Sequence, residues 1–183
     1  MRLQDIFELE SAEKYNDAFS QYQKLILENN TGFETWKYYF FFLWRMIEDV
    51  DGLFRKDIDL RTKLNIELKN GLLKYSELAE FNFIAGYAIC IFPYEFGEYE
   101  ELDNKGREML EKATQIEPSN PIYKMAYLGS LTLNEKGQRL YEKACLESQT
   151  ILKESYNGKG FLNEYFTDVF NRDGKPTGNN VYS

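Results

Sequence analysis

One nine-residue segment occurs twice in this chain, and this repeat restricts the possible fold more than any other feature of the sequence. The segment from Lys105 to Ala113 aligns without gaps on the segment from Lys136 to Ala144, with lysine, glycine, glutamate, lysine and alanine at matching places. The offset is 31 residues (137 − 106). A period in the low thirties is typical of stacked helix-turn-helix repeats, in which each unit contributes two helices.

Each copy of the repeat carries two small residues seven positions apart, which is about two turns along one face of a helix. They are Gly106 and Ala113 in the first copy, and Gly137 and Ala144 in the second. Small side chains let another helix approach closely, while the bulky residue between them fills the remaining gap. We therefore predict that both pairs face a neighbouring helix at close range.

Helical periodicity also dominates outside the repeat. Apolar residues from Tyr15 to Ile26 follow a three- and four-residue spacing, and stop signals such as Asn29–Gly32, Asp51–Gly52, Pro93 and Pro118 separate segments of helical length. The expected helices are 15–26, 33–50, 60–75, 81–92, one around 109–116, 121–133, 136–152 and 161–170. The sequence predicts an all-α fold of eight or nine helices in antiparallel pairs without a sheet. Residues 1–172 are expected to form a single domain and 173–183 a polar tail.

The most aromatic stretch of the chain runs from Trp36 to Trp44 and holds seven large rings. A helix that is apolar on every side is packed on every side. An inner helix of a small helical stack is thus favoured over an exposed interface.

Composition excludes several classes of chemistry. The chain has no histidine, which removes Ser-His and Cys-His nucleophile pairs, histidine bases and most zinc sites. It has no phosphate-binding loop, dinucleotide-binding glycine pattern, calcium loop or nucleophile elbow. Paired carboxylates among the 30 acids could still act together. We expect a protein that is not an enzyme and needs no cofactor or metal.

The formal net charge is −8. An acidic surface repels nucleic-acid phosphates and anionic membranes, so neither is expected as a direct partner, whereas a basic protein would be attracted. No basic segment followed by an apolar run opens the chain, and no apolar stretch is long enough to span a membrane. Cys90 and Cys145 stand among apolar neighbours, which favours buried free thiols over a disulfide. These features favour a cytoplasmic protein.

The second helix of the expected pairs resembles the tetratricopeptide motif, in which small, bulky and small residues precede a proline. Gly106, Leu110, Ala113 and Pro118 match that order and spacing. Ala18, Tyr22, Leu25 and Asn30 match it more loosely, and Tyr127–Leu128–Gly129 is similar to the leucine-glycine pair of the first helix. The resemblance covers most of residues 12–150 and implies a degenerate tetratricopeptide-like superhelix that binds proteins or peptides.

The segment from Tyr94 to Asp103 combines acids with aromatic rings more densely than any other part of the chain. It could be a solvated connection between two helices, or a contact surface in which tyrosines supply rigid area and carboxylates pair with basic side chains. The residues of the second interpretation are Tyr94, Glu95, Glu98, Tyr99, Glu100, Glu101 and Asp103.

Two functions fit these observations. A single acidic, aromatic-rich domain of degenerate helical repeats is similar to immunity proteins of bacterial contact-dependent growth inhibition systems. That resemblance implies a cognate toxin domain encoded nearby, expected to be a basic nuclease, whose active cleft the immunity protein covers. The alternative is a tetratricopeptide-like adaptor or regulator that binds a protein or peptide in a groove. A line of Lys, Arg and Asn on the inner helices, which such a groove would often carry, is not apparent.

Overall fold

The computed structural model describes residues 2–28, 32–48, 54, 57–97 and 99–172. Within these residues it contains nine α-helices, one short 3-10 helix (η1) and no strand, which confirms the predicted all-α fold. None of the helices in the described part combines the length and apolar character needed to cross a membrane. The elements are α1 (Leu3–Ser11), α2 (Tyr15–Leu27), α3 (Phe33–Glu48), α4 (Leu60–Tyr75), α5 (Ala79–Ile91), η1 (Pro93–Glu95), α6 (Tyr99–Ile116), α7 (Pro121–Gly129), α8 (Glu135–Ser155) and α9 (Phe161–Phe170).

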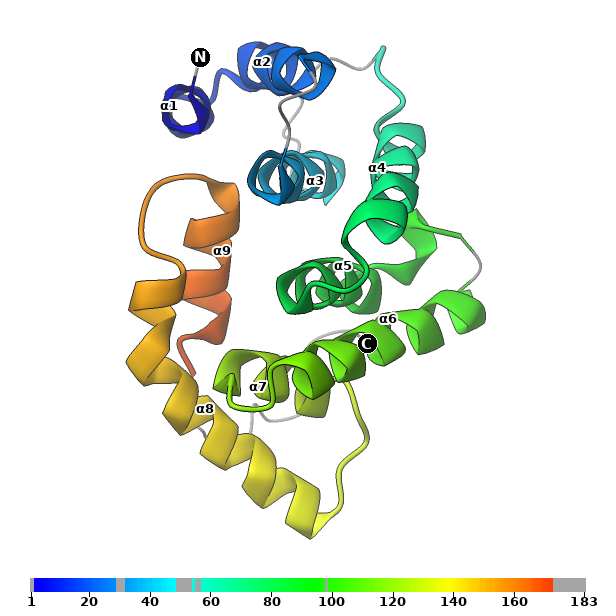
Figure 1. Cartoon of the computed structure of the whole chain (residues 1–183), viewed down its shortest axis with the longest axis vertical. Coiled ribbons are helices and arrows are strands. Elements are labelled where there is room, and N and C mark those ends of the chain that lie inside the picture. The colour runs from blue at the N-terminus through cyan, green and yellow to red at the C-terminus, as the bar shows by residue number, and fades with distance from the viewer. Residues whose placement is uncertain (1, 29–31, 49–53, 55–56, 98, 173–183) are drawn as a thin grey trace.

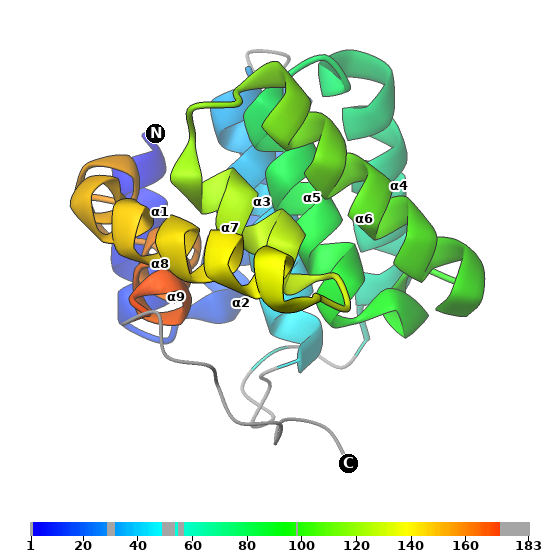
Figure 2. The same cartoon turned by 90° about the horizontal axis from the view of Figure 1, so that it is seen from below.

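Consecutive helices pack as pairs: α1 with α2, α3 with α4, α5 with α6, and α7 with α8. The pairs follow one another around the molecule, and α9 then returns to pack against α3 and α8 (Figure 1). Seen from below, α5 lies between α3 and α6 (Figure 2). The path of the chain is therefore a short helical stack whose last helix comes back to its beginning.

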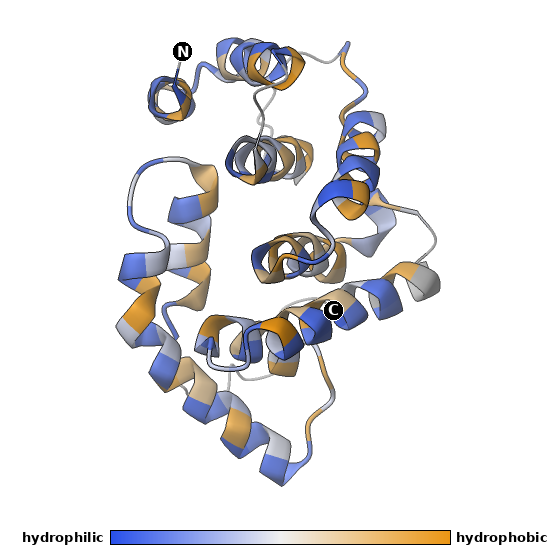
Figure 3. Ribbon diagram, in the orientation of Figure 1, coloured by the Kyte–Doolittle hydropathy of each residue, from blue (hydrophilic) through white to orange (hydrophobic). Residues whose placement is uncertain are grey.

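The core lies around α3 and α5. Every residue from Phe81 to Ile89 is buried, and so is every residue from Tyr39 to Trp44. The rings of Trp36 and Phe81 join the two helices, with centroids 5.0 Å apart. Hydropathy colouring shows α5 mostly in apolar colours and blue along much of α6 and α8 (Figure 3). The interpretation of the aromatic run as core is confirmed, although Tyr38 within it is only partly buried.

The two copies of the repeat do not play the same part. A Cβ atom added to Gly106 would lie 2.7 Å from Sγ of Cys90, and one added to Gly86 would lie 2.9 Å from the carbonyl oxygen of Gly106. These two glycines let the backbones of α5 and α6 meet. Gly137 instead faces Leu133, just before its own helix, so the prediction that it meets a neighbouring helix is wrong. Gly137 lies in the first turn of α8, and its backbone N–H donates to the side-chain oxygen of Asn134, the residue that precedes the helix.

Some helix boundaries also differ from those expected. Helix α1 was not predicted, because acids interrupt its apolar residues and only Ile6, Phe7 and Glu10 are buried. Helix α6 begins at Tyr99, so the acidic stretch after it is helical rather than a connection. Helix α7 ends at Gly129 instead of continuing to Leu133.

Candidate functional site

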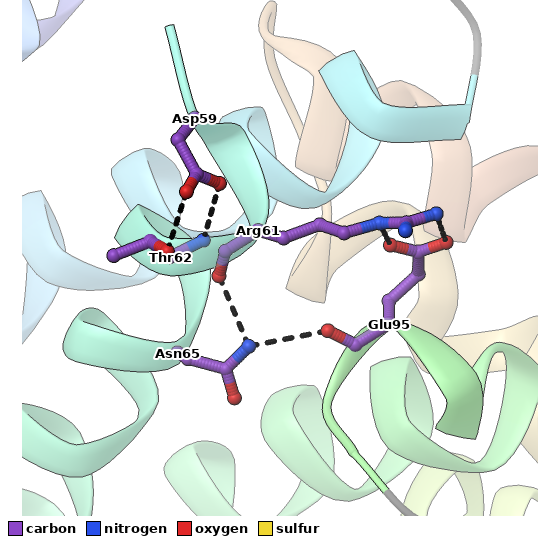
Figure 4. Close-up of polar contacts among 5 residues, drawn as sticks. All are labelled: Asp59, Arg61, Thr62, Asn65 and Glu95. Atoms are coloured by element: carbon purple, nitrogen blue, oxygen red, sulfur yellow. Dashed lines mark hydrogen bonds and ion pairs between the residues drawn. The ribbon is translucent and has the colours of Figure 1, made fainter.

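The acidic-aromatic segment begins with a short 3-10 helix, Pro93–Glu95, and its glutamate points inward. The carboxylate of Glu95 is buried and accepts hydrogen bonds from Nε and Nη2 of Arg61, the second residue of α4 (Figure 4). Arg61 itself is largely exposed. This corrects the sequence-based assignment of Glu95 as a partner-binding residue, because its charge is already paired within the chain and lies away from solvent.

The beginning of α4 is built to hold this turn in place. Asp59 caps the helix by accepting from the backbone N–H of Thr62 at 3.0 Å and from its hydroxyl at 2.7 Å. These hydrogen bonds hold the pKa of Asp59 below its ordinary value. Nδ2 of Asn65 donates both to the carbonyl of Arg61, at 3.0 Å, and to the carbonyl of Glu95, at 3.2 Å (Figure 4). Helix α4 and the turn therefore form one hydrogen-bonded unit.

The aromatic residues of the segment divide between core and surface. Phe96 is buried and stacks on Phe40 at 6.3 Å between centroids. The ring of Tyr94 lies edge-on to Phe92 and is 54% exposed. Tyr94 is thus the predicted contact residue that the structure places at the surface. The remaining predicted residues lie in the first turns of α6 (Tyr99, Glu100, Glu101, Asp103), with side chains outside the description, or outside the described residues altogether (Glu98).

Helix α9 covers the inner faces of α3 and α5. The ring of Phe166 lies 5.3 Å from that of Phe41 and 5.0 Å from that of Phe83, between centroids. Tyr165 packs edge-on to Trp44 at 5.5 Å, and its hydroxyl lies 3.3 Å from that of Tyr87. In a helical-repeat stack this inner surface is the usual place for a bound peptide. Here the chain's own last helix occupies it.

Large apolar side chains are exposed on the opposite, outer side of the stack. Leu27 at the end of α2 is 80% exposed, and Ile66 and Leu73 on α4 are 50% and 84% exposed. Leu27 and Ile66 line one groove of about 150 Å³ between the two helices. This surface is not evident from the sequence, because the four-residue spacing of Leu60, Leu64, Leu68 and Leu72 indicates only the inner face of α4. Leu73 falls outside that spacing, and this departure is a sign in the sequence of an apolar residue on the outer face of α4.

A second cavity, of about 290 Å³, lies where α5, α7 and α9 end against α6. Arg107 and Arg172 line it. The carboxyl ends of helices carry partial negative charge, and cationic side chains stabilise them. Nε of Arg172, for example, donates to the carbonyl of Val169 at 2.9 Å, in the last turn of α9. The end of α9 therefore accounts for the position of Arg172 in this cavity.

Titratable groups elsewhere in the described residues do not form a metal site: no group of three or more histidine, cysteine, aspartate or glutamate side chains could hold an ion there. Neither Cys90 nor Cys145 takes part in a disulfide within the described residues. Cys145 is buried, as predicted, and burial raises the pKa of its thiol, whereas Cys90 is only partly buried. Comparison of the chain with protein-family models, with curated proteins and with solved structures gave no match.

Proposed function

We propose that this chain is an immunity protein, which binds a cognate toxin domain and neutralises it by covering the toxin's active cleft. The observation that carries the proposal is the position of α9. Its aromatic residues fill the inner face of the stack, against Phe41 and Phe83. A partner must then bind to the outer surface of a domain that is already folded. A preformed surface favours tight binding by an inhibitor, because no segment has to lose conformational entropy when the complex forms.

The charge of the chain supports a basic partner, such as a nuclease domain encoded beside it. A net charge of −8 attracts a basic protein over distance and increases the rate of association. Tyr94 supplies an exposed ring next to the most acidic stretch of the sequence. In this proposal Glu98, Tyr99, Glu100, Glu101 and Asp103 complete the contact, Glu95 anchors the turn from inside, and the complex forms in the cytoplasm of the protected cell.

The proposal competes with an adaptor that binds peptides on the inner face. In an adaptor of that kind α9 would have to leave α3 and α5 before a peptide could enter. The inhibitor needs no such rearrangement, and it is therefore the function that this geometry supports better.

The test is binding and inhibition with the toxin domain encoded next to this gene. We expect one-to-one binding and loss of the toxin's activity when the two purified proteins are mixed. Reversing Glu98, Glu100 and Glu101 to Lys should slow association most at low ionic strength, because salt screens exposed charges. Tyr99→Ala should mainly accelerate dissociation.

A matched control reverses three acids on the distant helix α8, Glu142, Glu147 and Glu154. This variant changes the net charge by the same amount but leaves the acidic-aromatic segment intact. Similar rates for both triple variants would show that the segment is not the contact. The absence of any binding to the neighbouring toxin domain would refute the inhibitor proposal itself.

A further inference from the structure

Helix α4 differs in charge from the rest of the chain. It holds four basic residues, Arg61, Lys63, Lys69 and Lys74, and one acid, Glu67. Its formal charge is thus +3, which leaves −11 on the other residues of a chain with net charge −8. Glu67 is buried, and burial raises its pKa. The charge that α4 presents to solvent is therefore basic, in a protein that is acidic elsewhere.

The exposed face of α4 also carries apolar side chains between these bases. Ile66, Lys69 and Leu73 follow one another at three- and four-residue spacing, so they lie on one face of the helix. All three are exposed, as is the neighbouring Lys74. Apolar and basic groups alternate along this face over about 10 Å, the rise of two helical turns.

The groove beside α4 extends this face towards α2. Leu27 and Ile66 form its apolar rim and Lys63 a basic one. Nζ of Lys63 lies 5.7 Å from the centre of the Phe19 ring, so its position is tied to α2. The groove is large enough to receive a leucine side chain of a partner, so this surface offers a recess as well as exposed apolar groups. We refer to Leu27, Lys63, Ile66, Lys69, Leu73 and Lys74 as the α2–α4 surface. The groove as a whole is lined by Gln23, Ile26, Leu27, Tyr39, Lys63, Ile66 and Glu67.

We propose that the α2–α4 surface docks an acidic amphipathic helix of a partner protein, with apolar side chains of that helix in the groove and along Leu73. Charge complementarity selects this occupant. A second copy of the chain joined by a symmetric α4–α4 contact would place Lys69 and Lys74 against their own like charges. An anionic bilayer would attract α4 but repel the remaining −11 charges. The inference does not rest on the proposed inhibitor function.

The surface has the composition of a helix-binding groove. Apolar anchors spaced along a partner helix enter such grooves, and charged groups around them select the partner and speed its arrival. An acidic partner helix would bury leucines against Leu27, Ile66 and Leu73 while its carboxylates reach the three lysines. A basic helix with the same leucines would meet the same apolar surface but like charges.

The test uses two synthetic helical peptides with identical leucine faces, one with glutamate and one with lysine at every polar position. Binding to the full-length protein is measured by fluorescence anisotropy at low and moderate salt. We expect the glutamate peptide to bind and the lysine peptide not to bind. Ile66→Ser with Leu73→Ser should weaken binding about tenfold or more, as the loss of buried anchors does. Lys69→Gln with Lys74→Gln should weaken it chiefly at low salt.

Control variants carry equivalent changes at exposed positions of α8, Leu146→Ser and Lys153→Gln. They should bind the glutamate peptide like the wild type. All of the altered side chains are exposed, so we expect every variant to fold like the wild type. Circular dichroism of each variant checks that its helical content is unchanged. Equal binding of the two peptides, or equal losses in the α8 variants, would overturn the proposal. The proposal would also be overturned if neither peptide binds and the protein instead sediments with anionic vesicles, or associates with itself, in a way that depends on Leu73.

Discussion

The carboxylate of Glu10 in α1 accepts a hydrogen bond from the backbone N–H of Phe161, the first residue of α9, at 3.0 Å. The residue before α9 is Gly160, which has no side chain to cap the helix, and a Cβ atom there would lie 2.8 Å from the Phe7 ring. Glu10 therefore supplies from α1 the carboxyl oxygen that caps α9, a cap that α9 cannot supply for itself. The other carboxylate oxygen accepts from the hydroxyl of Tyr22 at 2.8 Å. One buried side chain thus joins the first, second and last helices.

This arrangement predicts a stability that falls as the pH rises. Burial raises the pKa of Glu10 to about 7, against the two hydrogen bonds that favour its charged form. Between pH 4.5, the ordinary pKa of a glutamate, and about pH 7, the folded protein therefore keeps a proton on Glu10 that the unfolded chain has already released. The contribution is fully present below pH 4.5, and roughly 3 kcal/mol of stability is lost by the time the pH passes 7.

Urea unfolding of the wild type and of Glu10→Gln between about pH 5 and pH 8 tests this expectation. The neutral amide has no ionisation to lose, so the free energy of unfolding of the variant should fall less steeply over that range. Glu8→Gln serves as the control, because Glu8 is exposed and contacts Lys159 at the surface. Parallel pH profiles for wild type and Glu10→Gln would mean that Glu10 is not the group responsible.

The two glycines of the sequence repeat should respond in opposite ways to the same change. Gly106→Ala puts a methyl group against Cys90 and near the carbonyl oxygen of Gly86, where backbone cannot yield easily. We expect a loss of about 1–3 kcal/mol, the usual cost of overpacking. Gly137→Ala meets only the flexible side chain of Leu133, so it should be neutral or stabilise α8 by up to about 1 kcal/mol.

Thermal unfolding of the two glycine variants is sufficient to compare them. Equal destabilisation would restore the expectation that the repeat marks equivalent packing positions. The difference already present in the structure has a local cause: identical residue patterns can cap a helix in one place and join two helices in another.

The sequence predicts helices in this chain well because apolar spacing and stop signals are local properties. The burial of the Trp36–Trp44 run follows from the same reasoning, since a helix apolar on all sides has no face to turn to water. The ion pair between Arg61 and Glu95 could not be predicted in this way. The two residues are 34 positions apart, and a glutamate in an acidic stretch gives no sign that it is buried.

The position of α9 is the other feature that local patterns do not contain. The segment from Phe161 to Phe170 reads as a short amphipathic helix, but nothing in it indicates which helices it will cover. Its docking depends on the curvature of the whole stack and on contacts such as Glu10 with Phe161. The exposed apolar side chains of α4 could be predicted in part. Leu73 departs from the apolar spacing of the helix, which is a signal, but a single exposed leucine is common in proteins and is weak evidence of a surface.

Helix α9 should behave as part of the core rather than as a removable cover. Phe166 is fully buried, and six rings of the described residues lie around it: those of Phe41, Phe83, Tyr87, Tyr156, Tyr165 and Phe170. Phe166→Ala should therefore cost about 3–5 kcal/mol and lower the midpoint of the single unfolding transition. Leu146→Ala, at an exposed position of α8, should change stability by no more than about 0.5 kcal/mol.

Hydrogen exchange distinguishes the alternatives for α9. If α9 is integral to the core, the amides of α5 lose protection in Phe166→Ala together with those of α9. If exchange accelerates in α9 alone and the global midpoint stays unchanged, the inner face can open independently. That result would favour the peptide-binding adaptor over the inhibitor.

The pair formed by Arg61 and Glu95 provides the last prediction, on both stability and binding. The Glu95 side chain is 2% exposed and that of Arg61 65% exposed, so removing the arginine leaves a buried carboxylate without its partner. Arg61→Ala should cost about 1–2 kcal/mol, a buried-pair cost reduced by solvent around the arginine. Adding Glu95→Gln removes the charge but keeps the shape, and should recover part of the loss.

In kinetics with a basic toxin domain, Glu95→Gln alone should leave the low-salt association rate close to that of the wild type. The triple reversal of Glu98, Glu100 and Glu101 should reduce that rate clearly. A double variant less stable than Arg61→Ala would mean that the Glu95 carboxylate stabilises the turn even without its arginine. A marked loss of association rate in Glu95→Gln would mean that Glu95 acts on the partner.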